Sequence, residues 1–495
     1  MRFKCLISIL CLTVVANLSG AAQAPVVSPS IPNIVFVLCD DLGYGDVQIL
    51  NPEHGKIPTP SMDRLGREGM IFTDAHSGSS VCTPTRYGLL TGRYSWRTSL
   101  QRGVVQGFKP CLIARERPTV ASFLKAQGYH TAIVGKWHLN FLYLDPETQK
   151  PIQRKGRHTL APVGSTIPDG PVDRGFDYYH GFHHAGDMKG VIENDTVIAH
   201  EDEIHMLPRL TQKAVEYIDA RAQDDDGQPF FLYVPYGSPH TPIVPTEDWK
   251  GKSGLGDYAD FVMQTDAGFG EILAALDRNG LTDNTLVIFS SDNGCSKAAN
   301  IPALAQQGHQ VSAEFRGSKA DLWEGGHRVP FIVRWPEVVQ AGSRSDQLLC
   351  LTDFFASCAD ILDTKLPSDG AEDSVSFLPA LKGEPIVSTR EGVIHHSISG
   401  HFGYRMGKWK LLLARGSGGW TSPKEDQAKR SRAPVAQLYD LANDPSETTN
   451  LYESQPEVVQ RLLAQLEADV FRGRSTEGST AKNDVKQIQL WKSGR

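Results

Sequence analysis

Short runs of apolar, mostly branched residues alternate with segments of helical periodicity over the first 370 residues or so of the chain. The apolar runs cover residues 34–39, 130–134, 230–236, 285–290 and 331–334, and the helical patterns cover residues 61–68, 119–127, 210–222 and 258–279. Continuous apolar strands that alternate with amphipathic helices indicate a largely parallel sheet with helices on both faces. We therefore expect an α/β fold with a large, mostly parallel central sheet flanked by helices.

The pattern changes after about residue 369. Residues 393–396, 403–406, 409–413 and 437–441 are typical of short strands joined by glycine-containing turns, and residues 457–470 are typical of a final helix. This predicts a smaller antiparallel subdomain closed by a terminal helix. The expected division is an α/β domain at residues 25–370, the antiparallel subdomain at 371–471, and a loose polar tail at 472–495.

The first 24 residues have the layout of a secretory signal peptide. Arg2 and Lys4 precede an apolar stretch at residues 5–15, and residues 22–24 read Ala-Gln-Ala, a small-residue cleavage site. A membrane anchor fits less well, because the apolar run is short and ends in polar and small residues. No later stretch approaches the length of a transmembrane segment. We expect an exported protein, either periplasmic or secreted.

Composition narrows the possible partners. The 495 residues carry 50 basic and 57 acidic side chains, a net charge of −7; without Arg2 and Lys4 the balance is 48 − 57 = −9. A mildly acidic chain without a basic block is a poor nucleic-acid binder, and any site for an anion must be built locally. Six cysteines follow the predicted signal, and their spacings match neither a zinc site nor a disulfide framework.

Oxygen-bearing side chains follow two of the predicted strands. Asp40 and Asp41 come directly after the first strand, and Asp292 and Asn293 follow the fourth. Ligands of parallel sheets bind beyond the carboxyl ends of the strands. Three carboxylates and an amide suit a hard cation, and Ca²⁺ tolerates irregular geometry better than Mg²⁺. The alternative is that these residues only cap helices or turns.

Cys82 lies in the segment Ser-Val-Cys-Thr-Pro-Thr-Arg at residues 80–86. Thr83 can serve as an N-cap and Pro84 as the first helical residue, which predicts Cys82 just before a helix N-terminus, where an anion is favoured. Arg86 can return to the same helix end. From the residues alone, Cys82 is either a thiol nucleophile of low pKa or an ordinary buried cysteine. A cysteine hydrolase would need a partnered histidine, which the sequence does not mark.

The pattern Cys-x-Pro-x-Arg, followed by Leu-Leu-Thr-Gly-Arg at residues 89–93, resembles the signature of the formylglycine-dependent type I sulfatases of the alkaline phosphatase superfamily. The resemblance spans nearly the whole chain after the predicted signal. Its further motifs, in the family's order, are residues 40–41, 135–139, 238–240, 292–294, 316–319, 323–326 and 328–330. It implies an alkaline-phosphatase-type fold and an arylsulfatase-like sulfuric ester hydrolase that converts a sulfate monoester to an alcohol and inorganic sulfate.

The resemblance also implies a cofactor and a covalent modification. Asp40, Asp41, Asp292 and Asn293 would bind Ca²⁺, with an oxygen from modified Cys82 beside them. In this family the cysteine is oxidised after translation to an aldehyde, formylglycine (3-oxoalanine). A formylglycine-generating maturation enzyme is therefore an expected partner of this chain.

The implied mechanism gives each remaining motif residue a role. One hydroxyl of the aldehyde hydrate would attack sulfur, activated by the metal and by Asp292, while Arg86 and Lys136 hold the hydrate. Lys319 would contact the sulfate, and His240 would protonate the departing alcohol. His138 would then take the second hydroxyl proton, so that sulfate leaves and the aldehyde is restored. Such a site needs a cation, positive side chains and a proton donor, because charge develops on the sulfate and leaving oxygens.

The residues that contact the rest of the substrate are marked less clearly. His184 and Asp187 lie in an aromatic, glycine-containing loop with His180 and His183, and His396 lies in the predicted C-terminal subdomain near His395 and His401. Because imidazoles and carboxylates hydrogen-bond sugar hydroxyls, our hypothesis is that His184, Asp187 and His396 line a carbohydrate pocket. The alternative is a solvated loop of mixed composition. A sulfated sugar or glycan fragment is the expected substrate.

Two other functions remain to be weighed. A phosphatase or phosphodiesterase of the same superfamily would use a serine or threonine nucleophile and two transition metals held by several histidines and aspartates. This chain instead has a cysteine at that position and an oxygen-rich ligand set for a single metal. A catalytically silent sulfoglycan-binding protein would keep the metal ion and the positively charged side chains but carry unconverted Cys82.

Overall fold

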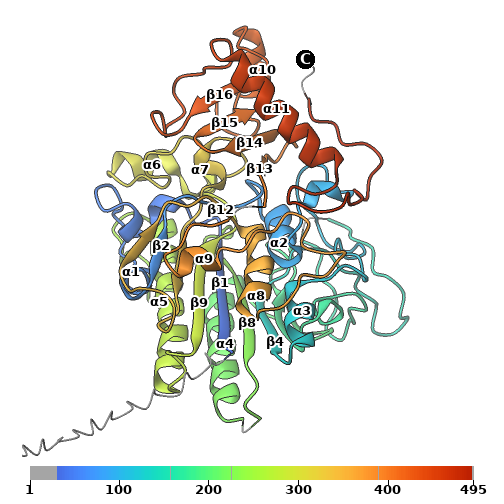
Figure 1. Ribbon diagram of the computed structural model, residues 1–495. Coiled ribbons are helices and arrows are strands. Elements are labelled where there is room, and N and C mark those ends of the chain that lie inside the picture. Colours follow the sequence, from blue (N-terminus) through green and yellow to red (C-terminus); the bar gives the residue numbers. More distant parts are fainter. Residues whose placement is uncertain (1–30, 157, 225, 388, 493–495) are drawn as a thin grey trace, which may run out of the picture. The chain divides into compact units, whose positions relative to one another are not determined.

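The computed structural model describes residues 31–492, apart from residues 157, 225 and 388, so the predicted signal peptide lies outside the described residues. A ten-stranded sheet forms the centre of this part of the chain (Figure 1). Its strands are, in spatial order, β11 (Ser343–Ser345), β2 (Met70–Phe72), β10 (Phe331–Arg334), β9 (Thr285–Ser291), β1 (Asn33–Asp40), β8 (Phe230–Pro239), β4 (His130–Lys136), β5 (Tyr178–Phe182), β6 (Gly190–Glu193) and β7 (Thr196–His200).

The middle of the sheet is parallel, as predicted. Strands β9, β1, β8, β4 and β5 run in one direction, while β10 is antiparallel to β9, β6 to β5 and β7 to β6. Along β1, Ile34 and Phe36 face one apolar cluster, and Val35 and Val37 face the other. Both faces of the strand are therefore buried, which explains why its sequence is continuously apolar.

Helices cover each face of the sheet, and their bounds agree with the predicted ones to within a few residues. On one face lie α1 (Pro60–Glu68), α4 (Met206–Ala222) and α5 (Asp257–Arg278). On the other lie α2 (Cys82–Thr91), α3 (Val120–Ala126), α8 (Phe354–Ile361) and α9 (Leu378–Leu381). The short helices α6 (Ile301–Gln306) and α7 (Glu324–His327) and the strand pair β3 (Ala75–His76) and β12 (Leu349–Cys350) precede the C-terminal sheet, and the short helix α10 (Glu425–Arg430) lies between two of its strands.

A four-stranded antiparallel sheet and a terminal helix form the C-terminal part, as predicted. The strands are β13 (Val393–His396), β14 (Phe402–Met406), β15 (Trp409–Leu412) and β16 (Gln437–Asp440), and α11 (Pro456–Phe471) packs against β14 and β15. Lys410 of β15 is fully buried and binds Glu324, the first residue of α7, and Glu447, each at 2.8 Å. This ion cluster fixes the C-terminal sheet to the segment that follows β9.

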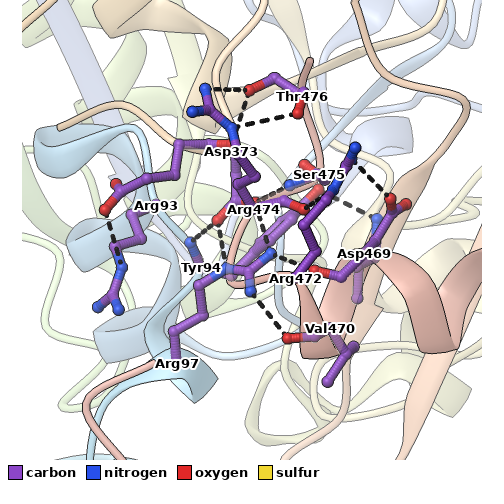
Figure 2. A network of polar contacts seen from close by, with 12 residues as sticks. Arg93, Tyr94, Arg97, Asp373, Asp469, Val470, Arg472, Arg474, Ser475 and Thr476 are labelled. Carbon is purple, nitrogen blue, oxygen red and sulfur yellow. Dashed lines mark hydrogen bonds and ion pairs between the residues drawn. The ribbon is translucent and has the colours of Figure 1, made fainter. Parts of the chain in front are cut away.

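Residues 472–492 pack against the protein and do not form the loose tail that the sequence predicts. The Ser475 backbone N–H donates to the buried carboxylate of Asp373 at 2.9 Å, and Arg97 donates to the same carboxylate (Figure 2). Arg97 Nη1 also donates to Asn483 Oδ1 at 3.0 Å. Arg93 of the loop after α2 binds Asp484 at 3.0 Å, and Ile488 is buried. The polar composition of residues 472–492 predicts a loose tail, but hydrogen bonds and ion pairs with residues distant in sequence fix this segment to the rest of the protein. Within the described residues, no helix is both long enough and apolar enough to span a membrane.

Candidate active site

The four predicted metal ligands meet at the carboxyl ends of two neighbouring strands. β1 and β9 are paired so that Cys39 lies opposite Ser291, which places the residues that follow side by side. The Asp41 backbone N–H donates to Asp292 Oδ1 at 3.3 Å, and Asn293 Nδ2 donates to Asp41 Oδ1 at 2.7 Å. Asp41 adopts a left-handed backbone with φ of 64°, a conformation that is costly for a residue other than glycine and is concentrated at functional sites.

Oxygen atoms of this group lack hydrogen-bond partners. Asp40 Oδ1, Asp41 Oδ2 and Asn293 Oδ1 are buried, and no donor within the described residues satisfies them. A buried carboxylate oxygen without a donor is costly, so the arrangement fits a cation held by oxygen ligands. Groups able to hold a metal ion include Asp40 with Cys82 and Asp292, and Asp40 with Asp41 and His240. This is a possible metal-binding site beside Cys82.

Cys82 is the first residue of α2, and the predicted capping is wrong. Val81 is the N-cap and makes no side-chain cap, while Thr83 Oγ1 accepts a hydrogen bond from the Val105 backbone at 3.3 Å. Burial raises the pKa of the Cys82 thiol, although Lys136 and Lys319 oppose the rise. A raised pKa does not support the interpretation of Cys82 as a thiol nucleophile of low pKa. Cys82 nevertheless lies at the N-terminus of α2 and beside the candidate metal ligands Asp40 and Asp292, as predicted from the sequence.

Arg86 and Lys136 cross-link the carboxylates below Cys82. Arg86 donates to Asp292 Oδ2 through Nε at 3.1 Å and Nη2 at 2.7 Å, and its Nη1 donates to the Lys136 carbonyl at 3.1 Å. Lys136, the last residue of β4, donates to Asp40 Oδ2. Burial alone would raise the pKa of Asp40, but Lys136, His240 and Arg86 hold it well below its usual range. Burial and the charge of Asp40 raise the pKa of Asp292.

Lys319 completes the charge balance of the site. Its ammonium is 2.5 Å from Asp41 Oδ1, and the loop that carries it is held because the Ala320 N–H donates to the Ser80 carbonyl at 2.8 Å. Lys319 therefore lies against the segment that leads into Cys82. Three carboxylates face three buried cations, so the described side chains are neutral as a group, and a divalent cation would leave the site positive toward an anionic substrate.

Two histidines flank Cys82 with one ring nitrogen engaged and the other free to react. His138 Nε2 contacts the Val105 carbonyl at 3.1 Å, which places the proton on Nε2, while the buried Nδ1 has no partner. His240 Nδ1 contacts the Thr241 carbonyl at 2.6 Å, and its Nε2 lies 3.6 Å from Asp41 Oδ2. Burial lowers the pKa of both rings, assisted by Lys136 at His138 and by Lys319 at His240.

A cavity of about 160 Å³ opens above these groups. It is lined by Val81, Cys82, Val104, Gln106, Lys136, His138, His184, Ala185, Gly186, His240, Lys319, Ile398 and Trp420. Gln106, Ile398 and Trp420 were missed from the sequence, because they come from loops without a motif that reach the site only through long-range packing. A larger groove of about 740 Å³ lies along α4 and α5, but it contains none of the predicted site residues.

The three predicted substrate residues have different placements. His184 lines the cavity; Asp187 does not, because it is 2% exposed and accepts hydrogen bonds from His184 Nδ1 at 2.8 Å and Tyr143 Oη at 3.2 Å. Asp187 therefore orients His184 with Nε2 free. His396 is buried in β13 and is not among the lining residues. Nor are the other histidines considered with them: His180, His183, His395 and His401.

Comparison with known proteins gives a consistent assignment. The family description "Sulfatase" matches residues 32–364. An N-acetylgalactosamine-6-O-sulfatase of Bacteroides thetaiotaomicron is 32% identical over 490 residues, covering 88% of this chain and 93% of that protein. Arylsulfatase A of Bos taurus is 31% identical, covering 90% of this chain and 88% of that protein.

Solved structures agree with the fold. A structure from work on the metabolism of multiple glycosaminoglycans by Bacteroides thetaiotaomicron aligns with a TM-score of 0.74 and 29% identity, covering 89% of this chain and 99% of that one. Ps i-CgsB in complex with k-i-k-neocarrahexaose shares the fold at a TM-score of 0.70 and 24% identity, covering 91% and 95%. The site geometry and these matches together show that the chain belongs to the sulfatase family and is a sulfuric ester hydrolase.

Proposed function

We propose that this protein is an exported sulfatase that removes the sulfate monoester of a sulfated carbohydrate, with Cys82 converted to formylglycine and Ca²⁺ bound beside it. The relative that is an N-acetylgalactosamine-6-O-sulfatase makes 6-O-sulfated N-acetylgalactosamine the first substrate to test. Export rests on the signal-peptide pattern of residues 1–24.

One observation carries the proposal. Cys82, at the first turn of a helix, lies beside three orphaned oxygens and is surrounded by Arg86, Lys136 and Lys319. A buried thiol with a raised pKa does not need three cations and three oxygen atoms without hydrogen-bond partners around it. A sulfate ester that reacts at this position would find a cation site, fixed positive charge and two histidines within one small cavity.

The two groups that the chain would acquire supply distinct chemistry. Ca²⁺ would be held by Asp40, Asp41, Asp292 and Asn293 and would polarise the sulfate oxygens. Formylglycine at position 82 would supply the attacking hydroxyl after hydration of its aldehyde. The donor set supports calcium, since all four side chains offer oxygen and none of them is a histidine.

The remaining residues bind, orient and move protons. Lys319 and Lys136 reach the cavity as ammonium groups and would bind the sulfate oxygens, while Arg86 holds the carboxylate of Asp292 in place. His240 lines the cavity, and because its Nδ1 faces the Thr241 carbonyl it acts as an acid only when Nε2 carries a second proton. The negative charge of the bound sulfate would favour this imidazolium, and Nε2 would then give its proton to the alcohol oxygen as the sulfur–oxygen bond to the sugar breaks. His138 Nδ1, which has no partner, would accept the proton whose removal lets inorganic sulfate leave.

The cavity limits which part of a glycan can enter. Its volume of about 160 Å³ lies below the ~300–1,000 Å³ of ordinary ligand pockets, so it fits a sulfate and the single sugar that carries it. His184 Nε2 would hydrogen-bond a sugar hydroxyl, with Asp187 behind it as a positioning residue. Trp420 and Ile398 would cover the apolar side of the ring.

The decisive assay is sulfate release from N-acetylgalactosamine 6-sulfate and from other sulfated monosaccharides, with protein that has been coexpressed with a formylglycine-generating enzyme. We expect inorganic sulfate from the wild type and none above background from Cys82→Ala. Phosphate release from phosphate monoesters that exceeds sulfate release and depends on zinc would favour a phosphatase. Binding of sulfated sugars without turnover, by protein with intact Cys82, would favour a binding protein.

A further inference from the structure

The turn between β13 and β14, residues 397–401, is part of the cavity wall. Ile398 lines the cavity, and its N–H donates to the carbonyl of Ala320, the residue after Lys319, at 3.3 Å. In the other direction, the Gly103 N–H donates to the Ile398 carbonyl at 2.8 Å, close to the lining residues Val104 and Gln106. The outer side of this turn therefore adjoins the mouth of the active site.

Three chain segments meet at Gly400, on the same turn. Gly400 has a φ of 86°, and a Cβ there would lie 2.6 Å from the Gln101 carbonyl oxygen, 3.3 Å from Lys492 Cε and 3.4 Å from Arg102 Cβ. Only glycine fits this position without displacing its neighbours. The close approach brings the side chains of Arg102 and Lys492 together beside the turn.

These two cations have no carboxylate partner. Within the described part of the chain, neither Arg102 nor Lys492 takes part in an ion pair or a side-chain hydrogen bond, and burial, followed by the charge of Arg102, lowers the pKa of Lys492. The cations inside the site differ in this respect, because Lys319 binds Asp41 and Arg86 binds Asp292. Arg102 is exposed and Lys492 is half-buried, so their repulsion is partly screened by solvent, and an anion bound between them would be attracted by both charges.

A third nitrogen group lies next to this pair. His396, at the end of β13, is 2% exposed, and its Nε2 is buried without a hydrogen-bond partner. Burial lowers the pKa of His396 to about 3, and the charge of Lys492 contributes. The His396 ring is hydrogen-bonded to the Gly400 backbone, so the unpartnered Nε2 carries no proton while the ring is neutral. An anion beside Lys492 would offset the positive charge that lowers this pKa and would favour protonation of Nε2, which would then donate to the anion.

We propose that Arg102 and Lys492, with His396 behind them, form an anion subsite beside the catalytic cavity. It binds a second negatively charged group of the substrate, a sulfate or a uronic acid carboxylate, on the sugar next to the one that loses its sulfate. The inference rests on the proposed function, since the neighbouring sugar is defined by a sulfated sugar in the cavity. It assigns this enzyme to glycans that carry more than one anionic group.

The test compares two substrates that end in the same sugar. One is the monosaccharide N-acetylgalactosamine 6-sulfate; the other is a chondroitin 6-sulfate trisaccharide with that sugar at its non-reducing end. We expect the double variant R102Q/K492Q to lower the ratio of kcat/KM, trisaccharide over monosaccharide, about tenfold. The charge-preserving variant R102K/K492R should restore most of the ratio. Lys382→Gln, at an exposed lysine that does not line the cavity, should leave it unchanged.

The anion itself is identified with a carboxyl-reduced form of the trisaccharide. If the uronate of the neighbouring sugar is the ligand, the wild-type ratio falls on reduction and R102Q/K492Q has little further effect. In this trisaccharide the second sulfate lies on the third sugar, so an effect of R102Q/K492Q that survives reduction would contradict the placement of the anion on the neighbouring sugar. A ratio that is the same for wild type and R102Q/K492Q with both trisaccharides overturns the proposal.

Failure of the proposed function gives a different result. If the matured wild type hydrolyses neither sugar, binding of the trisaccharide to Cys82→Ala protein is measured by calorimetry. The subsite still predicts about tenfold weaker binding when R102Q/K492Q is added to Cys82→Ala. Equal binding by the two proteins contradicts it.

Discussion

Calcium should stabilise the folded protein measurably, because the fold leaves oxygen atoms of the candidate metal site without hydrogen-bond partners. Asp40 Oδ1, Asp41 Oδ2 and Asn293 Oδ1 are buried without hydrogen bonds, and they are the atoms that a bound cation would satisfy. The perturbation is removal of calcium with a chelator, followed by stepwise return of calcium or magnesium. The assay is the midpoint of thermal unfolding at a fixed heating rate.

The magnitude follows from ligand linkage. Calcium at about a hundred times its Kd adds about 2.7 kcal/mol to the free energy of unfolding. About 460 ordered residues with an unfolding entropy of about 2.1 cal/mol/K each give roughly 1 kcal/mol/K, so the midpoint should rise by about 3 °C. Magnesium at the same concentration should give a smaller shift, because it demands a more regular geometry.

A ligand variant and a matched control make the prediction specific. Asp41→Asn keeps the size of the side chain and removes a charged ligand, so we expect calcium affinity at least tenfold weaker, which removes about 1.4 kcal/mol, or about 1.4 °C, at the same calcium concentration. Asp177→Asn, at a carboxylate that pairs with Lys125 on the surface, should respond to calcium like the wild type. If neither removal of calcium, nor its return, nor Asp41→Asn changes the midpoint of thermal unfolding, the reasoning is refuted.

Three further predictions concern the supports of the site. Lys410→Met leaves Glu447 buried without its cation and Glu324 with Arg328 as its remaining ion-pair partner among lysines and arginines of the described residues, so chemical denaturation should show a loss of about 3–5 kcal/mol in the free energy of unfolding. Asp187→Ala removes the acceptor that fixes the His184 tautomer; it should raise KM for a sulfated sugar more than for an aryl sulfate, and equal changes for both would contradict the assignment. Asp373 has a folded pKa below its usual value, since Arg97 outweighs its burial. Its stabilisation is therefore present above about pH 3.9 and lost as the pH falls through the folded pKa, and Asp373→Asn should flatten this part of a stability–pH profile.

The sequence predicted those parts of the fold that depend on local pattern. The strands around residues 34–39 and 285–290 are continuously apolar because both of their faces are buried, and the polar residues after them fall at one edge of the sheet because the strands are parallel. The sequence therefore predicted that the four candidate metal ligands lie together. The antiparallel C-terminal sheet was equally visible, since its strands are short and separated by turns.

Features that depend on distant contacts were missed or misjudged. Ile398 and Trp420 reach the cavity from the C-terminal part through packing that has no sequence signal. Residues 472–492 look like a loose tail because they are polar, yet Asp484 forms an ion pair with Arg93, which is distant from it in sequence. Thr83 was expected to cap α2, but its hydroxyl accepts from Val105 instead, so helix entry was decided by tertiary contacts.

The central claim is that Cys82 is the precursor of the nucleophile and does not act as a thiol. The most direct test is the mass of the tryptic peptide that runs from residue 68 to residue 86, from protein made together with a formylglycine-generating enzyme. The account predicts that the thiol has been replaced by an aldehyde or its hydrate in the active fraction. An intact, alkylatable cysteine in protein that releases sulfate at full rate would contradict it.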